Sequence, residues 1–107
     1  MAREQFQTLT EPMYYILLAL TEECCGVDIM EKVETLSDGR VKVGPGTLYA
    51  MLSRFEENHI ICRTAEEGRR KWYVITKLGV DMLKKEYERL KQMVKDGEGY
   101  FAGKENL

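Results

Sequence analysis

Apolar residues recur three and four positions apart along most of the 107-residue chain, which predicts a largely helical fold. The first helix should begin near Thr10, a good N-cap, with Pro12 in the tolerated first turn of the run that ends in MYYILLAL. A second helix should follow Cys25-Gly26 and end near Leu36. Its apolar positions share one face: Ile29, Met30, Val33 and Leu36.

The third predicted helix lies in VGPGTLYAMLSRFEENHII and has two contrasting faces. Gly44 can cap it and Pro45 suits its first position, so it should run from there to about Asn58. The positions i, i+3, i+4 and i+7 form its buried stripe: Leu48, Met51, Leu52 and Phe55. The other face, apart from Glu57, is small or hydrogen-bonding: Gly46, Thr47, Tyr49, Ala50, Ser53 and Arg54. Such a face can approach another surface closely and reach phosphates.

Alternating apolar residues predict a β-hairpin after this helix. We expect a strand over residues 60–64, a turn over 65–70 that contains Gly68, and a returning strand over 71–76. Because side chains alternate along a strand, the returning strand has two faces. One face carries Trp72, Val74 and Thr76, and the other carries Lys71, Tyr73 and Ile75.

Two helices are suited to packing against a partner. The first helix is apolar on nearly all sides, so one flank must pack outside its own small domain, and homodimerisation is the simplest solution. The last helix should run from its cap at Thr76 to about Lys95. Along it a seam steps by four, three and four positions: Leu83, Tyr87, Leu90 and Val94.

The predicted order is helix, helix, helix, hairpin, helix, which is the organisation of a winged helix-turn-helix. We therefore expect one mostly α structural domain with a small two-stranded β-hairpin. Residues 1–76 would form the winged helix-turn-helix with its N-terminal helix, and residues 77–95 the dimerisation helix. Residues 96–107, which contain three glycines, would form a flexible tail. In this organisation one helix enters the major groove and the hairpin lies over the adjacent backbone.

The charge distribution favours a polyanionic partner. The net charge is −2, but residues 40–77 carry eight cations against four acids, whereas residues 1–39 carry two against eight. A charge run can also be a solvated face, so its placement decides. Arg69, Arg70 and Lys71 stand together at the predicted hairpin tip, and we interpret them as contacts to phosphates.

Other functional classes lack the residues they need. With one histidine, no CxxC pair and no phosphate-cradling loop, we expect no catalytic site, no metal site and no cofactor. No apolar run is long enough to cross a membrane or act as a signal peptide, so we expect a cytoplasmic protein. The adjacent Cys24 and Cys25 are typical of reduced packing thiols, although a redox role stays open.

Two motifs at this separation resemble the PadR family of bacterial transcriptional regulators. GPGTLYAMLSRFEENHII is similar to the family's G-T-L-Y helix, and GRRKWYVITKLG to its wing pattern G-R-x-K-Y-Y-x-L-T-x-x-G. The resemblance covers about residues 9–95 and fits the short members. The resemblance implies a homodimeric repressor that binds double-stranded DNA. Its two subunits would be joined through their first and last helices, and the third helix of each would lie in a groove of the DNA. Implied interface residues are Tyr14, Tyr15, Leu18, Leu83, Tyr87, Leu90 and Val94.

The sequence departs from the family pattern at three places. His59 stands where glycine is common, and a helix C-cap in the left-handed region suits histidine better than most residues. Trp72 and Val74 share one face, which would pack on the partner subunit or extend a ligand pocket. Some short members bind planar drugs through a tryptophan in the last helix, where this chain has Leu90.

Two questions stay open at this stage. The dimer interface could admit a small aromatic ligand or be ordinarily packed. A winged-helix module that binds proteins instead of DNA is the alternative function, because the fold does not decide it.

Overall fold

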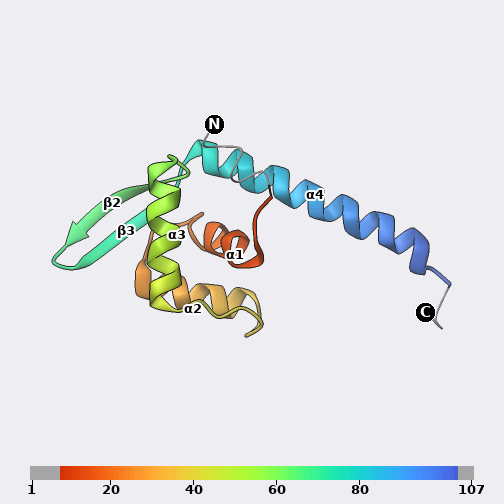
Figure 1. Cartoon of the computed structure of the whole chain (residues 1–107), viewed down its shortest axis with the longest axis horizontal. Coiled ribbons are helices and arrows are strands. Elements are labelled where there is room, and N and C mark those ends of the chain that lie inside the picture. The colour runs from red at the N-terminus through yellow and green to blue at the C-terminus, as the bar shows by residue number, and fades with distance from the viewer. Residues whose placement is uncertain (1–7, 104–107) are drawn as a thin grey trace.

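The computed structural model describes residues 8–103. Within this range the elements, in chain order, are α1 (Glu11–Ala19), β1 (Cys24–Cys25), α2 (Gly26–Leu36), α3 (Pro45–Glu57), β2 (Ile61–Glu67), β3 (Arg70–Ile75) and α4 (Lys77–Phe101) (Figure 1). The expected fold class, mostly helical with a small antiparallel hairpin, is confirmed. None of the helices in the described residues combines the length and the apolarity that a bilayer span needs.

The helix boundaries follow local capping chemistry. Thr10 and Thr76 are the predicted N-caps, and their side-chain oxygens accept from the backbone N–H groups of Met13 (3.4 Å) and Gly79 (3.1 Å). At the end of α3, His59 has φ 60°, the left-handed conformation that the sequence predicted. The N–H of Ile60 donates to the carbonyl of Phe55 at 2.9 Å, which completes a Schellman ending.

The sheet has one strand more than the predicted hairpin. β1 pairs antiparallel with β3, so the strand order is β1-β3-β2. Two residues are too short to show an alternating pattern, which is why the sequence concealed this strand. The two cysteines of β1 are buried, and burial raises the pKa of the Cys24 thiol, which disfavours its reactive thiolate.

The hairpin is longer than predicted and its turn is tighter. β2 continues to Glu67 and β3 begins at Arg70, so only Gly68, at φ +61°, and Arg69 lie between the strands. We refer to β2, β3 and this turn (residues 61–75) as the wing. Because two-residue hairpin turns need positive φ, Gly68 suits the position. The predicted turn over residues 65–70 was therefore too wide.

The core lies where α1, α2 and α3 meet the root of the wing. Of the predicted stripe on α3, Leu48, Leu52 and Phe55 are fully buried and Met51 is half-buried. On α2 the predicted stripe was wrong at Leu36, whose side chain is 52% exposed. It lies in the last turn of α2, where it lines a surface groove beside Leu18 instead of the core.

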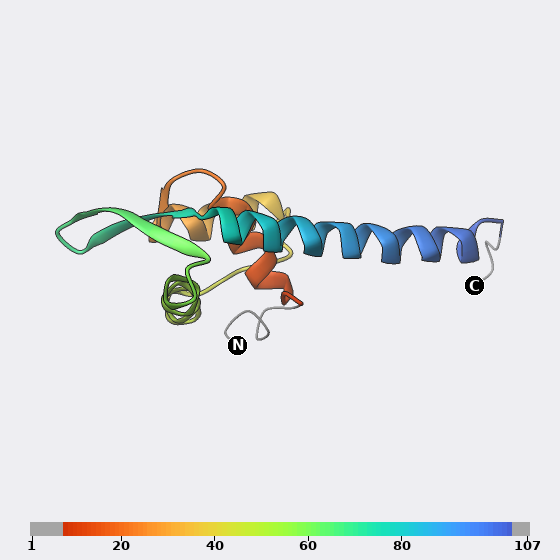
Figure 2. The same ribbon diagram turned by 90° about the horizontal axis from the view of Figure 1, so that it is seen from above.

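α4 extends well beyond the core. Its predicted end near Lys95 was too early, because the helix continues through Gly97 and Gly99 to Phe101. Each glycine weakens a helix by only about 1 kcal/mol, which an established helix can absorb. Residues 104–107 of the predicted tail lie outside the described residues. The second half of α4 projects away from the rest of the chain, as Figure 2 shows.

α4 begins against the end of α3. The Thr76 N–H donates to the Ile60 carbonyl (2.9 Å), and the Thr76 hydroxyl donates to the His59 carbonyl (2.6 Å). A Cβ added to Gly79 would overlap the Ile60 carbonyl oxygen and would lie 2.6 Å from Cγ1 of Ile75. The first turn of α4 can therefore approach this backbone only because residue 79 has no side chain.

We expect Gly79→Ala to lower the free energy of unfolding by about 2–3 kcal/mol, because the added methyl overlaps a backbone oxygen that is fixed by hydrogen bonds. Gly97→Ala is the matched control on the projecting half of α4, where the nearest atom to an added Cβ is 4.0 Å away. It should raise the same free energy by up to about 1 kcal/mol. Denaturant unfolding measures both, and equal effects would contradict the close approach at Gly79.

Candidate nucleic-acid interface

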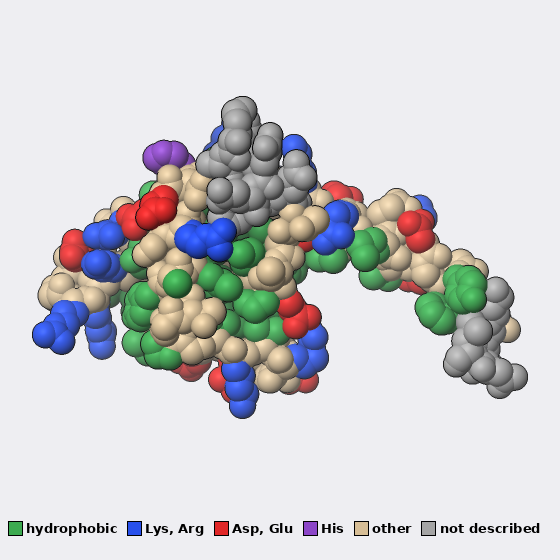
Figure 3. Space-filling view, in the orientation of Figure 1, with side chains coloured by type: hydrophobic (Ala, Val, Ile, Leu, Met, Phe, Trp, Pro, Cys, Tyr) green, Lys and Arg blue, Asp and Glu red, His purple; other side chains and the backbone are tan. Residues whose placement is uncertain are grey.

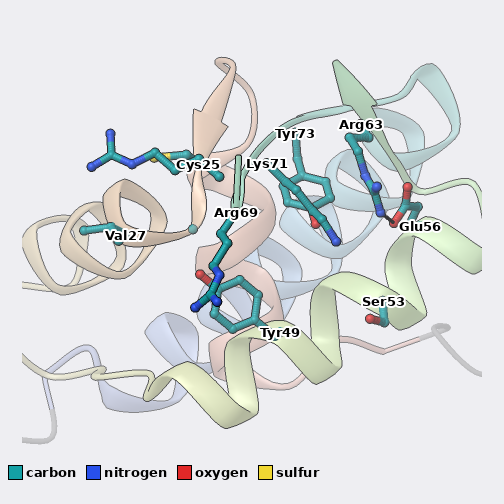
Figure 4. Close-up of a pocket in the computed structure, with 11 residues that line it drawn as sticks. Cys25, Val27, Tyr49, Ser53, Glu56, Arg63, Arg69, Lys71 and Tyr73 are labelled. Atoms are coloured by element: carbon teal, nitrogen blue, oxygen red, sulfur yellow. Dashed lines mark hydrogen bonds and ion pairs between the residues drawn. The ribbon is translucent and has the colours of Figure 1, made fainter. Parts of the chain in front are cut away.

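A groove of about 320 Å³ runs between the outer face of α3 and the wing. Its walls also include the first turn of α2, so three separate elements meet there (Figure 4). Cations line one side through Arg69, Arg70 and Lys71, and hydroxyl groups line the other through Tyr49 and Ser53. A groove of this composition can hold an anionic, hydrogen-bonding ligand such as a nucleic-acid backbone.

The predicted outer face of α3 is exposed along its length. Tyr49 and Ser53 line the groove, whereas four further predicted contacts lie on α3 outside it: Gly46, Thr47, Ala50 and Arg54. A Cβ added to Gly46 would meet nothing within 4 Å, so the start of α3 is open to an approaching surface. Glu57 is also exposed at the C-terminal end of this helix.

The predicted wing cations lie at the tip and edge of the hairpin. Arg69 lies in the turn and Arg70 begins β3, and both are exposed, while Lys71 is half-buried. Basic side chains gather at this end of the molecule in the space-filling view (Figure 3). None of the three forms an ion pair with another residue of the range 8–103. Their charges are therefore available to a ligand.

Within residues 8–103, Arg63, unlike these three cations, forms ion pairs with carboxylates of the same chain. It joins β2 to α3 through Glu56 (3.2 Å) and reaches Glu66 in the same strand (3.4 Å). The hydrogen bond with Glu56 raises the pKa of Arg63, so the guanidinium stays charged and paired. This pair connects the wing to α3 and neutralises a carboxylate that lines the groove.

The wing is held to the core through one face of β3. Tyr73 lies on the predicted inward face and is 4% exposed. Burial raises the pKa of Tyr73, which keeps its hydroxyl neutral. Trp72 and Val74 lie on the other face and are half-buried.

The residues predicted for a dimer interface occupy four different places. Tyr14, Tyr87, Leu90 and Val94 line a concave surface of about 640 Å³ between α1 and α4. Burial and the neighbouring Tyr87 raise the pKa of Tyr14. The other three residues lie elsewhere.

Tyr15 accepts a hydrogen bond from Arg40 (2.7 Å), and Leu18 lies in the groove beside Leu36. Leu83 is 7% exposed and packs in the core of the single chain, so its burial needs no partner.

A buried carboxylate connects α4 to the segment before α1. Glu86 is 3% exposed and accepts a hydrogen bond from the Leu9 N–H (2.8 Å). Arg89, one helical turn away, pairs with it at 2.6 Å and lowers its pKa, so Glu86 is ionised although it is buried. The sequence reasoning had assigned no role to this residue.

Sequence reasoning also missed the part of the groove that comes from α2. Gly26 and Val27 line it beside Cys25 of β1, and the sequence predicted only the helix start at Gly26. A glycine at the first position of a helix was the available signal. Among the described residues, no group of three His, Cys, Asp or Glu side chains is placed to hold a metal ion.

Comparison with known proteins agrees with this architecture. The family model described as the transcriptional regulator PadR-like family matches residues 16–85, which is more than half of the chain. The chain has no significant match among curated protein sequences.

Solved structures of similar fold include a transcriptional regulator from Clostridium thermocellum, with 24% identity, 84% of this chain and 88% of that chain covered, and a TM-score of 0.69. A PadR family transcription regulator from Clostridium difficile shares 26% identity, with 84% and 98% covered and a TM-score of 0.60. A PadR-like transcription factor from Bacteroides fragilis has 22% identity, 92% and 95% coverage and a TM-score of 0.67.

The family model describes transcriptional regulators, and these neighbours are named as transcriptional regulators or transcription factors, not as enzymes. With its winged helix and cation-lined groove, the chain belongs to the PadR-like family of DNA-binding transcriptional regulators.

Proposed function

We propose that the chain is a cytoplasmic, homodimeric repressor that binds operator DNA through α3 and the wing. The observation that carries the proposal is the groove between these elements, where three cations without ion pairs in the described range face an exposed helix of small and hydroxyl side chains. α3 would enter the major groove, and the wing would lie along the adjacent phosphates. In a dimer, the two α3 helices would be about 34 Å apart, one turn of DNA.

The wing cations should act on affinity and not on sequence preference. We expect Arg69→Ala and Arg70→Ala each to weaken binding to all duplexes alike, because phosphates are common to every sequence. Each change should make the log–log slope of affinity against salt shallower by about 0.9. The measurement is a fluorescence-anisotropy titration with the chain's own promoter at several salt concentrations.

Lys85→Ala is the control for these two variants. It removes one exposed positive charge from α4, outside the groove. It should leave the salt slope unchanged. A wild-type affinity that does not respond to salt would contradict DNA binding altogether.

The outer face of α3 should act on sequence preference. We expect Thr47→Ala and Ala50→Ser to change which base pairs are preferred, because both side chains are exposed on the helix that would face base edges. Binding to a library of operator variants measures this preference. If the wing substitutions moved the preferred site and the α3 substitutions did not, the roles assigned to the two elements would be reversed.

The proposed dimer uses the apolar seam of α4. Tyr87 and Val94 are 50% and 62% exposed, and the seam continues on the same face to Phe101, which is 62% exposed. Apolar side chains at this spacing on a projecting helix are suited to a second helix. The candidate seam residue Leu83 is less suitable for a test, because it also packs in the core.

We expect Val94→Glu to convert the dimer to a monomer at micromolar concentration, because the carboxylate would be placed in an apolar interface. Lys85→Glu introduces the same side chain nine residues earlier, half a rotation away on the helix, and should leave the dimer intact. Sedimentation measures both variants. A Val94→Glu monomer that still bound operator tightly would contradict a dimeric repressor.

We also propose that a small aromatic ligand relieves the repression. The concave surface between α1 and α4 supports it, because two tyrosines and two aliphatic side chains line it: Tyr14, Tyr87, Leu90 and Val94. Charged side chains at its margin could orient a polar substituent: Glu88, Lys91, Lys95 and Glu98.

A further inference from the structure

The first turn of α2 lies against α3, the proposed recognition helix, where Gly26 meets Tyr49. If Gly26 carried a Cβ, that atom would lie 2.5 Å from Oη of Tyr49 and 3.0 Å from the ring atoms Cε1 and Cζ. Distances of 2.5 Å do not occur between such atoms in folded proteins, because they lie inside the van der Waals radii. The Tyr49 side chain therefore rests on the space that Gly26 leaves empty.

The reason for a glycine at residue 26 is steric and not conformational. Gly26 begins an ordinary right-handed helix, and its φ is outside the positive range that favours glycine. Any residue could adopt this backbone, and alanine is the better helix former. The contact with Tyr49 is therefore the feature of this site that a side chain would disturb.

Tyr49 is placed for a ligand and not for the core. Its side chain is 47% exposed, and its hydroxyl has no hydrogen-bond partner among the described residues. Figure 4 shows Tyr49 extending from α3 towards the first turn of α2, and Arg69 of the wing lines the same groove. A tyrosine hydroxyl in this position can donate a hydrogen bond to a phosphate oxygen that the wing cations also attract.

We propose that Gly26 is a positioning residue for DNA binding: by lacking a side chain it lets Tyr49 lie across the start of α2, so that the Tyr49 hydroxyl and Arg69 face the same backbone phosphate. This role rests on the proposed DNA binding and deepens it. It couples α2 to the recognition helix, although Gly26 itself needs no contact with DNA.

The test is a double-mutant cycle of Gly26→Ala and Tyr49→Ala. In Gly26→Ala, the added methyl meets the far end of a flexible side chain, so Tyr49 can swing away while the fold stays intact. We expect its thermal midpoint to stay within a few degrees of the wild type. Its operator affinity should fall about 10- to 100-fold, the range for one lost hydrogen bond to a charged group.

Tyr49→Ala should lose affinity to the same extent, because it removes the same hydroxyl. The double variant should bind no more weakly than Tyr49→Ala alone, because the methyl at residue 26 then has nothing to displace. All three variants should keep the wild-type salt slope, because the Tyr49 hydroxyl is neutral and Arg69 is unchanged, so no contact between a cation and a phosphate is removed. A purely structural role would change the thermal midpoint and leave the cycle additive.

Three outcomes would overturn the role of Gly26. Additive effects of the two substitutions would do so, as would wild-type affinity in Gly26→Ala while Arg69→Ala weakens binding. Wild-type affinity in Tyr49→Ala would do the same without requiring Gly26→Ala to fold. A wild-type protein that binds no duplex would remove the proposed function together with this inference, so the two failures are distinguishable.

Discussion

The carbonyl group of Ile60 is the point on which the arrangement of the functional elements depends. It lies where α3 ends and the wing begins, and it accepts the Thr76 N–H at the point where the wing ends and α4 begins. The missing side chain of Gly79 lets the first turn of α4 lie directly against it. Recognition helix, wing and projecting helix are therefore joined within a few ångströms. A shift of any one of these elements would therefore move the backbone at Ile60.

The wing is held against the core at its root and is exposed at its tip. At the root, the Ile75 N–H donates to the Leu20 carbonyl at the end of α1 (2.8 Å), and Tyr73 is buried in the core. Opposite Tyr73 in the sheet, Arg63 pairs with Glu56 of α3 and so also connects the wing to that helix. Beyond that pair, Arg69 and Arg70 are exposed. Rigidity near α3 and exposed charge at the tip suit a surface that must meet a helical polyanion at a defined distance.

The same separation of fixed and free parts occurs in α4. Its first half is held by Leu83 in the core and by ionised Glu86, which accepts from the backbone of Leu9. Its second half carries exposed apolar side chains up to Tyr100 and Phe101. These two rings pack edge to face, with their centroids 5.4 Å apart. Surface of this kind on a projecting helix is costly in water for a single chain, which is the physical reason to expect a partner.

Much of this organisation was readable from the sequence. The caps at Thr10 and Thr76, the stripe on α3, the left-handed His59 and the basic wing are recorded in neighbouring residues, because capping, helical periodicity and turn chemistry are local. Other features depend on residues far apart in the chain. Only the tertiary structure decided that β1 joins the sheet, and that within residues 8–103 Arg63 has an ion-pair partner while Arg69 has none. Only it decided that Gly26 lies under Tyr49, because no local pattern specifies which distant side chains will share one space.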